Sequence, residues 1–425
     1  MKGFVALLLA GLPVVAHAQP GEHIRAGDAV ITPSLSTGVE YRTNVYRAES
    51  DTEGGADLRI GPQLEVDLQG SDVEFGLSGQ YEIRKYFGEL VDLDRYDNFD
   101  LGFTLSALPE KVVGIKIEEN ATLRNNPVEV FTSEDPYTTQ LSNDLQGALM
   151  LRPGTALEFG LGGLWSFDDY RVPTGSQVGG LRPFNRKNTF GPTFEGAWEF
   201  FPRTAFVVDA EYMMVRWQDN LVDATGDASL GGAVAVPDAD LYRVLGGMRG
   251  RVSSNLVLVL MAGYGGANYD EASVLDDVDE TIDQADVDAA AVGYDADLSG
   301  ADRLLISTQA RYSMGVGQTA AVGYSRNFQD AFFTNYVTYN YISSSLSNRF
   351  GSRVGTDLEF GVRFEDYAGE VDRTDIRLVG KADVTVNAAD WAQFTSGVWW
   401  NQRASTDDLV EYDDFNIHLL ATLVY

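Results

Sequence analysis

Residues 415–425 read FNIHLLATLVY, and an apolar side chain falls at every second position of this stretch. Side chains of a β-strand point alternately to the two faces of a sheet, so the stretch is predicted to be a strand with one apolar face. A terminal strand either leaves an open edge or pairs with another strand. Because residues 31–41 carry the same alternation, we predict that the two chain ends pair and close a barrel whose outer face meets lipid.

The same pattern repeats between these two ends. Each stretch has roughly the ten residues that a tilted membrane-spanning strand needs. The predicted strands are 33–42, 58–68, 73–84, 99–105, 113–124, 141–151, 157–167, 190–200, 206–217, 242–252, 256–264, 304–313, 320–328, 337–346, 354–365, 376–386, 392–400 and 415–425. We therefore predict an all-β fold, a transmembrane antiparallel up-and-down β-barrel of about 18 strands (range roughly 16–18) that forms one domain over residues 30–425.

Short and long connections alternate along the chain. Turn-forming residues give short connections, for example at 70–72, 202–203 and 347–349. The longest connections are acidic and cover 172–186, 219–237 and 270–302. Barrels of this class keep short turns in the periplasm and long loops outside the cell, so we expect long acidic extracellular loops and both termini in the periplasm.

The start of the chain is predicted to lie outside the fold. Lys2 precedes a short apolar run, and Ala16-His17-Ala18 forms a small-x-small cleavage site. This pattern is typical of a secretory signal peptide over residues 1–18, and the alternative is a helical anchor that stays attached. Cleavage near Ala18–Gln19 would leave 19–29 as a short periplasmic N-terminal segment.

Composition narrows the class of protein further. The 425 residues contain no Cys, 44 Gly, 11% aromatic residues and a formal net charge of -32. The charge argues against binding of nucleic acid or of anionic lipid, and the lack of Cys excludes disulfides and thiolate chemistry. After residue 18 no apolar run has the roughly 18 residues of a membrane helix. These features favour the bacterial outer membrane, and a soluble β-sandwich or propeller is the alternative.

Two details concern the lipid-facing side. Glu119 falls on the apolar face of its predicted strand, which requires a β-bulge or a position beyond the hydrocarbon. Aromatic residues near strand ends are expected to form the girdles at the two membrane surfaces. They are Tyr41, Tyr86, Phe87, Trp165, Phe167, Trp217, Tyr264 and Trp400.

The opposite face of the strands is rich in charge. Alternation predicts that the following side chains line the lumen: Glu65, Glu74, Glu82, Arg84, Lys116, Glu118, Asp209, Glu211, Arg243, Arg249, Arg251, Arg311, Asp357, Glu359, Arg363, Arg377, Lys381 and Asp383. One interpretation is the lining of a water-filled channel, since barrels of roughly 16 to 18 strands enclose an aqueous lumen. The other is that these charges pair across strands and stabilise the wall.

Signals for metal binding and catalysis are weak. Asp295 and Asp297 match the first half of a calcium-binding EF-hand loop, but Ile306 stands where its last acidic ligand belongs, so a solvated acidic loop is favoured. Of the three His, His17 leaves with the signal peptide, and only His23 and His418 remain as candidate bases. We expect no cofactor and no enzymatic activity.

One part of the chain resembles a known family. The segment PSLSTGVEYRTNVY at 33–46, Ile60-Gly61-Pro62 and Arg84-Lys85-Tyr86-Phe87 resemble the outer-membrane beta-barrel porin 2 family, although Thr43 replaces its usual acid. The resemblance is clearest over residues 30–130. It implies an outer-membrane passage for exopolysaccharide or capsule polymer, in some cases paired with a periplasmic polysaccharide export protein. It defines no catalytic or ligand-binding residues.

The sequence thus predicts a passive outer-membrane channel, most consistent with polysaccharide export. The alternatives are a general small-solute diffusion porin and a structural or calcium-binding surface barrel. Expected partners are outer-membrane lipid, lipopolysaccharide and the barrel-assembly machinery, which would recognise the C-terminal strand; nucleic acid is not expected.

Overall fold

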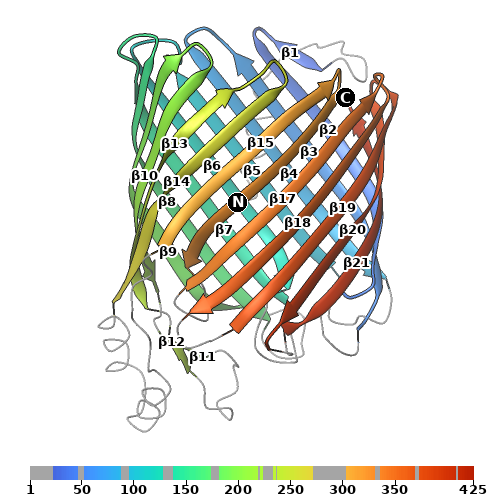
Figure 1. Cartoon of the computed structure of the whole chain (residues 1–425). Helices are drawn as coiled ribbons and strands as arrows, with labels where there is room; N and C mark the ends of the chain where they lie inside the picture. Colours follow the sequence, from blue (N-terminus) through green and yellow to red (C-terminus); the bar gives the residue numbers. More distant parts are fainter. Residues whose placement is uncertain are drawn as a thin grey trace.

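The structure is a closed antiparallel barrel of long strands (Figure 1). It is a computed structural model that describes residues 23–45, 52–87, 95–127, 137–173, 181–218, 221–223, 233–235, 237–270, 303–330, 336–368, 373–407 and 410–425. No helix within these ranges is long and apolar enough to cross a membrane. The predicted fold class is confirmed, with 18 strands in the barrel wall and one short additional strand, β1, in the same sheet.

The wall is built by strands that pair with their neighbours in chain order. They are β2 (Ala29–Arg42), β3 (Gly55–Gln69), β4 (Val73–Phe87), β5 (Arg95–Ala107), β6 (Val113–Pro127), β7 (Tyr137–Leu151), β8 (Leu157–Pro173), β9 (Leu181–Phe201), β10 (Thr204–Trp217), β13 (Asp238–Arg251), β14 (Leu256–Asp270), β15 (Arg303–Gly315), β16 (Gln318–Asp330), β17 (Tyr336–Phe350), β18 (Val354–Ala368), β19 (Arg373–Ala389), β20 (Ala392–Ser405) and β21 (Tyr412–Val424).

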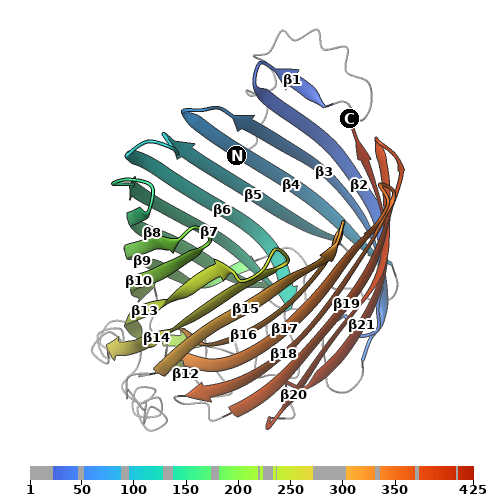
Figure 2. The same ribbon diagram turned by 45° about the horizontal axis from the view of Figure 1, so that its top comes forward.

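The barrel closes where the two ends of the chain meet. β2 and β21 pair antiparallel in a register that runs from Ser34 opposite Val424 to Arg42 opposite Asn416. The backbone N–H of Tyr425 adds a hydrogen bond to the carbonyl of Pro33 at 3.0 Å. Figure 2 shows the first strands of the wall (blue) beside the last (red). The closure predicted from the two alternating ends is therefore confirmed.

The segment assigned to residues 19–29 is partly inside the sheet, which corrects the predicted boundary. Residues 1–22, with the predicted signal peptide, lie outside the described residues. β1 (Ile24–Ala26) turns back at Gly27 and pairs with the first residues of β2. It lies along the edge of β2 that β21 does not reach, so it shields backbone groups that would otherwise form an open edge.

The strand ends joined by short turns and the strand ends joined by long connections lie at opposite ends of the barrel, as predicted. β1, the C-terminus and the short turns share one end, which we call the short-turn end; the other is the long-loop end (Figure 1). Some predicted limits were wrong. The turn expected at 347–349 lies at 351–353, because the Ser-rich stretch before it is paired on both sides.

The loop predicted at 172–186 is also too long, because β8 extends to Pro173 and β9 begins at Leu181. Beyond the apolar band both faces of a strand meet water, so alternation no longer marks the strand. The loop at 219–237 contains a small hairpin of β11 (Leu221–Asp223) and β12 (Ala233–Ala235). Most of the third predicted loop, 271–302, lies outside the described residues.

The outer face of the wall is apolar. Large hydrophobic side chains on it are exposed, among them Leu161, Leu260 and Leu419. Such a surface fits a membrane-spanning barrel, in which neighbouring strands satisfy all backbone hydrogen bonds. Of the predicted girdle residues, Trp165 and Tyr264 are exposed, whereas Tyr86 and Trp217 are buried. These two alternate onto the inner face, so assigning them to a girdle was wrong.

Two glycines on the inner face mark places where neighbouring backbones approach closely. A Cβ atom added at Gly263 would lie 1.8 Å from the carbonyl oxygen of Val244, and one at Gly191 would lie 1.7 Å from that of Tyr212. Backbone atoms cannot move aside as the end of a side chain can. A side chain at either position would therefore force the neighbouring backbone to shift.

We predict that Gly263→Ala destabilises the barrel by about 1–3 kcal/mol, because the added methyl group overpacks the wall. Gly147→Ala is the matched control, since nothing lies within 4 Å of a Cβ added there. Urea unfolding of the refolded protein in detergent, followed by tryptophan fluorescence, measures both variants. Equal midpoints for the two would contradict the close approach of the neighbouring backbone at Gly263.

Candidate functional site: the inner wall of the barrel

The 18 side chains predicted to face the lumen share one face of the wall. The ladders connect them in continuous registers, for example Thr104 opposite Glu118 opposite Gln146. In the next part of the wall Glu211 lies opposite Arg243. This face is opposite to the exposed apolar side chains, and contacts between non-adjacent strands occur on it. Many of the 18 residues form ion pairs or line one of two hollows on this face.

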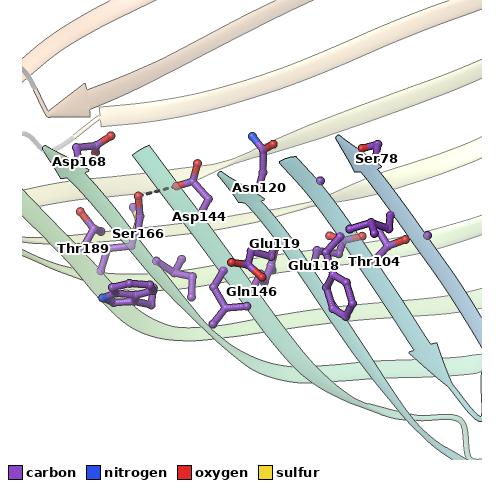
Figure 3. A pocket seen from close by; sticks show the side chains of 18 of the residues that line it. Ser78, Thr104, Glu118, Glu119, Asn120, Asp144, Gln146, Ser166, Asp168 and Thr189 are labelled. Atoms are coloured by element: carbon purple, nitrogen blue, oxygen red, sulfur yellow. Dashed lines mark hydrogen bonds between the residues drawn. The ribbon is translucent and has the colours of Figure 1, made fainter. Parts of the chain in front are cut away.

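One part of this wall forms an acidic hollow of about 740 Å³ along β3 to β10 (Figure 3). Carboxylates dominate its charged side chains, and Lys187 is the cation among the lining residues. The Lys187 Nζ lies 3.7 Å from Asp168, and the Ser166 hydroxyl donates to Asp144 at 2.5 Å. The acidic lining residues are Glu65, Asp67, Glu118, Glu119, Asp144 and Asp168. A solute that enters here meets mostly negative charge.

Glu119 belongs to this region but its side chain starts from the outer face. The ladders of β6 with β5 and β7 run through Glu119 without a register shift, so the β-bulge considered above is absent. Glu119 lies opposite Phe103 and Leu145, and the Asn143 amide donates to its carboxylate at 3.1 Å. A polar neighbour on the same face therefore compensates part of the cost of placing a carboxylate on this face.

A second charged region lies at the closing seam, on β2, β3 and β4. The Arg42 Nε is 2.7 Å from Glu40, and the Arg59 guanidinium also contacts the Glu40 carboxylate. Arg59 reaches Asp57 at 3.3 Å, and Arg84 reaches Asp57 at 3.7 Å. Three arginines thus share two buried carboxylates at the strands that seal the barrel.

The network continues on the other side of the seam, on β18, β19 and β20. Arg363, Arg377 and Arg403 are direct cross-strand neighbours, an arrangement that would be unfavourable without counterions. Glu365 lies 2.7 Å from both Arg363 and Arg377. Asp375 accepts from the Arg403 Nε at 2.9 Å. Two carboxylates therefore hold three arginines in one row.

Acids and bases in this seam network differ in exposure. The carboxylate side chains of Glu40, Asp57, Glu365 and Asp375 are 2%, 1%, 2% and 0% exposed. Most of the arginines paired with them have more exposed side chains: 15% for Arg42, 20% for Arg59, 16% for Arg84, and 26% for Arg363 and Arg377, whereas Arg403 is 0% exposed like its partner Asp375. The acids lie beneath the guanidinium groups, so the seam presents cations to the lumen.

A smaller hollow of about 440 Å³ opens beside these arginines and is called the seam hollow here. Its ionisable lining residues are Glu40, Arg42, Arg59, Arg84, Lys381, Asp383 and His418. Lys381 and His418 both contact Asp383, at 3.1 Å and 3.3 Å. Trp399 also lines the hollow, and Arg42 lies over its ring at 5.9 Å.

Sequence reasoning missed an apolar cluster inside the barrel near the long-loop end. Its core contains Val215, Trp217, Leu241, Leu305 and Phe328, all buried. Arg243 lies over the Phe328 ring at 5.1 Å and donates to the Phe328 carbonyl, while its other side pairs with Glu211. The available signal was the apolar character of Val215 and Trp217 at inward positions of β10.

The candidate metal ligands and catalytic bases from the sequence do not form one site among the described residues. Among the described residues no group of three or more His, Asp or Glu side chains is arranged to hold a metal, and Asp295 and Asp297 lie outside that part of the chain. His23 contacts the Thr32 hydroxyl at 3.0 Å near the short-turn end. His418 contacts Asp383 at the seam, so the two His lie in separate environments.

We predict that Arg403→Met lowers stability by about 3 kcal/mol or more, because it removes one partner of a pair whose side chains are both 0% exposed. Lys116→Met is the control, since Lys116 and Glu118 are both 45% exposed and such pairs contribute about 0–1 kcal/mol. Urea unfolding in detergent measures both, and similar losses would argue against a structural role for the buried row.

The comparisons with known proteins return structures only. No family model matches the chain, and no curated protein matches it. OccAB3 of Acinetobacter baumannii is 8% identical with a TM-score of 0.45, over 94% of this chain and 100% of that chain.

Two further solved structures are similar at the same level. The outer membrane protein OpdK of Pseudomonas aeruginosa is 10% identical with a TM-score of 0.46, over 94% and 98%. The siderophore receptor PirA of A. baumannii is 7% identical with a TM-score of 0.49, over 93% and 80%. At TM-scores below 0.5, these similarities identify neither a family nor a substrate for this chain.

Proposed function

We propose that this chain is a passive channel of the bacterial outer membrane. The observation that carries the proposal is the contrast between the two faces of the closed wall. Exposed apolar side chains cover the outside, whereas two polar hollows of about 740 and 440 Å³ open on the inside. Barrels of roughly 16 to 18 strands are wide enough to keep an aqueous lumen.

The outer membrane is the proposed location because closed strand barrels with an apolar band are the architecture of that membrane. The predicted signal peptide at 1–18 would direct export of the chain from the cytoplasm, as this location requires. In this arrangement the short turns face the periplasm, and the acidic connections face outward. Lipopolysaccharide and the barrel-assembly machinery would be the partners that such a protein meets there.

Within this class, export of an exopolysaccharide or capsule polymer is the function we favour. It is supported by the resemblance of residues 30–130 to the outer-membrane beta-barrel porin 2 family, although no family model matches the chain. A second support is an inner wall rich in hydrogen-bonding side chains, including Ser78, Thr104, Asn120, Gln146 and Ser166. A chain of sugar hydroxyls can exchange hydrogen bonds along such a wall.

We predict that the refolded barrel gives a steady single-channel current in planar bilayers, and that added polysaccharide fragments reduce this current. The reduction would arise because the polymer occupies the lumen and excludes ions. A steady current that polysaccharide leaves unchanged would instead favour a general diffusion porin. A silent barrel in the absence of partners would contradict a channel that is open by itself.

Deletion of the gene in its native host tests the finer proposal. We expect less polysaccharide at the cell surface, together with accumulation of polymer in the periplasm, because the outer membrane is the last barrier to export. Restoring the intact chain is the control. An unchanged amount of surface polymer would exclude export as the main function while leaving a diffusion channel possible.

A further inference from the structure

The seam hollow differs from the rest of the inner wall in the charge that it presents. The chain as a whole has a formal net charge of -32, and the acidic hollow on β3 to β10 has Lys187 as its cationic lining residue. The seam hollow is lined by four permanent cations, Arg42, Arg59, Arg84 and Lys381, and by two carboxylates. An anion inside the barrel is therefore attracted to the seam hollow and repelled by the acidic hollow.

The acids that pair with these cations are more buried than the cations, so a solute in the seam hollow meets mainly the cations. Glu40 is 2% exposed, whereas Arg42 and Lys381 expose 15% and 42% of their side chains. Arg42 uses its Nε for Glu40. These ionic contacts hold Arg42 and Lys381 at the wall of the hollow that both residues line. Pre-positioned cations of this kind bind an anion without first paying the entropy cost of ordering flexible side chains.

The other lining residues indicate which kind of chemical group would carry the anionic charge of the ligand. Trp399 contributes an aromatic surface beside Arg42, and Thr395 and Asn416 add a hydroxyl and an amide. An aromatic surface next to a few polar groups accepts a ring with one apolar face and polar edges. Sugar rings have this form, and a carboxylate on the ring would reach the guanidinium groups.

We propose that the seam hollow binds an anionic sugar unit, such as a uronic acid, through Arg42 and Lys381 on its carboxylate and Trp399 on its ring. This inference rests on the channel function proposed above, because the hollow must open onto the path of the solute. It makes the transported material an acidic saccharide. A planar carboxylate matches the two-pronged donor geometry of arginine.

Three substitutions test the site with little risk to the fold. Arg42→Gln leaves Glu40 paired with Arg59, and Lys381→Gln leaves Asp383 in contact with His418. Trp399→Phe keeps an apolar ring in place. Arg124→Gln is the matched control for charge, because Arg124 pairs with Asp100 on a different part of the inner wall and is 56% exposed.

The measurement is isothermal titration calorimetry of the refolded barrel in detergent with galacturonate oligomers. Their methyl esters are the neutral probes of the same length, and inorganic phosphate is the probe for any anion. We expect the oligomers to bind more tightly than the esters. Arg42→Gln and Lys381→Gln should each weaken binding roughly tenfold, since each removes a charged hydrogen bond, and Arg124→Gln should not.

Each outcome decides between the alternatives. Equal binding of oligomer and ester, or wild-type affinity in Arg42→Gln, would overturn the site. If phosphate displaced the oligomer at equal concentration, the seam hollow would be a general anion site, and the assignment of a sugar ligand would be overturned. Bilayer recording separates the site from the channel: binding without any current would contradict the channel function, and current with no block by oligomers would contradict the site.

Discussion

The pairing of β2 with β21 is the constraint on which the rest of the barrel depends. In hydrocarbon an unpaired backbone N–H or carbonyl costs several kcal/mol, so a sheet can span a membrane only when it has no open edge. Here the first and last long strands complete each other, and β1 covers the part of β2 that extends past Tyr425. All other strands then need only their neighbours in sequence, which explains the simple order of the wall.

The closure also explains the chemistry of the seam. Strands from the two ends of the chain must meet in one register, and the polar contact between Asn416 and Glu40 joins β21 to β2 directly. Carboxylates buried among arginines give this junction specific partners, which apolar packing alone does not provide. Because the acids are covered, the same contacts that align the strands leave a cationic surface inside an acidic protein.

The sequence was sufficient for most of the fold and for part of the site. All eighteen strands were predicted, because each has one face in lipid and alternates over its whole spanning length. Their outer ends were not, because strands such as β9 continue past the apolar band, where the alternation that marks a lipid-facing strand stops. Inward positions followed from alternation, but the row of Arg363, Arg377 and Arg403 depends on the relative shift of three strands. No single strand encodes that shift, so the seam hollow and its Trp399 could not be predicted.

The even number of strands has a consequence for how such a wall can change during evolution. Both β2 and β21 have their seam-forming chain ends at the short-turn end, so gain or loss of a single strand would carry one end to the opposite side of the membrane and make β2 and β21 parallel instead of antiparallel. The smallest step that keeps the antiparallel closure is a whole hairpin. Each added hairpin widens the circumference by two strand spacings, about 10 Å, so lumen size changes in discrete increments.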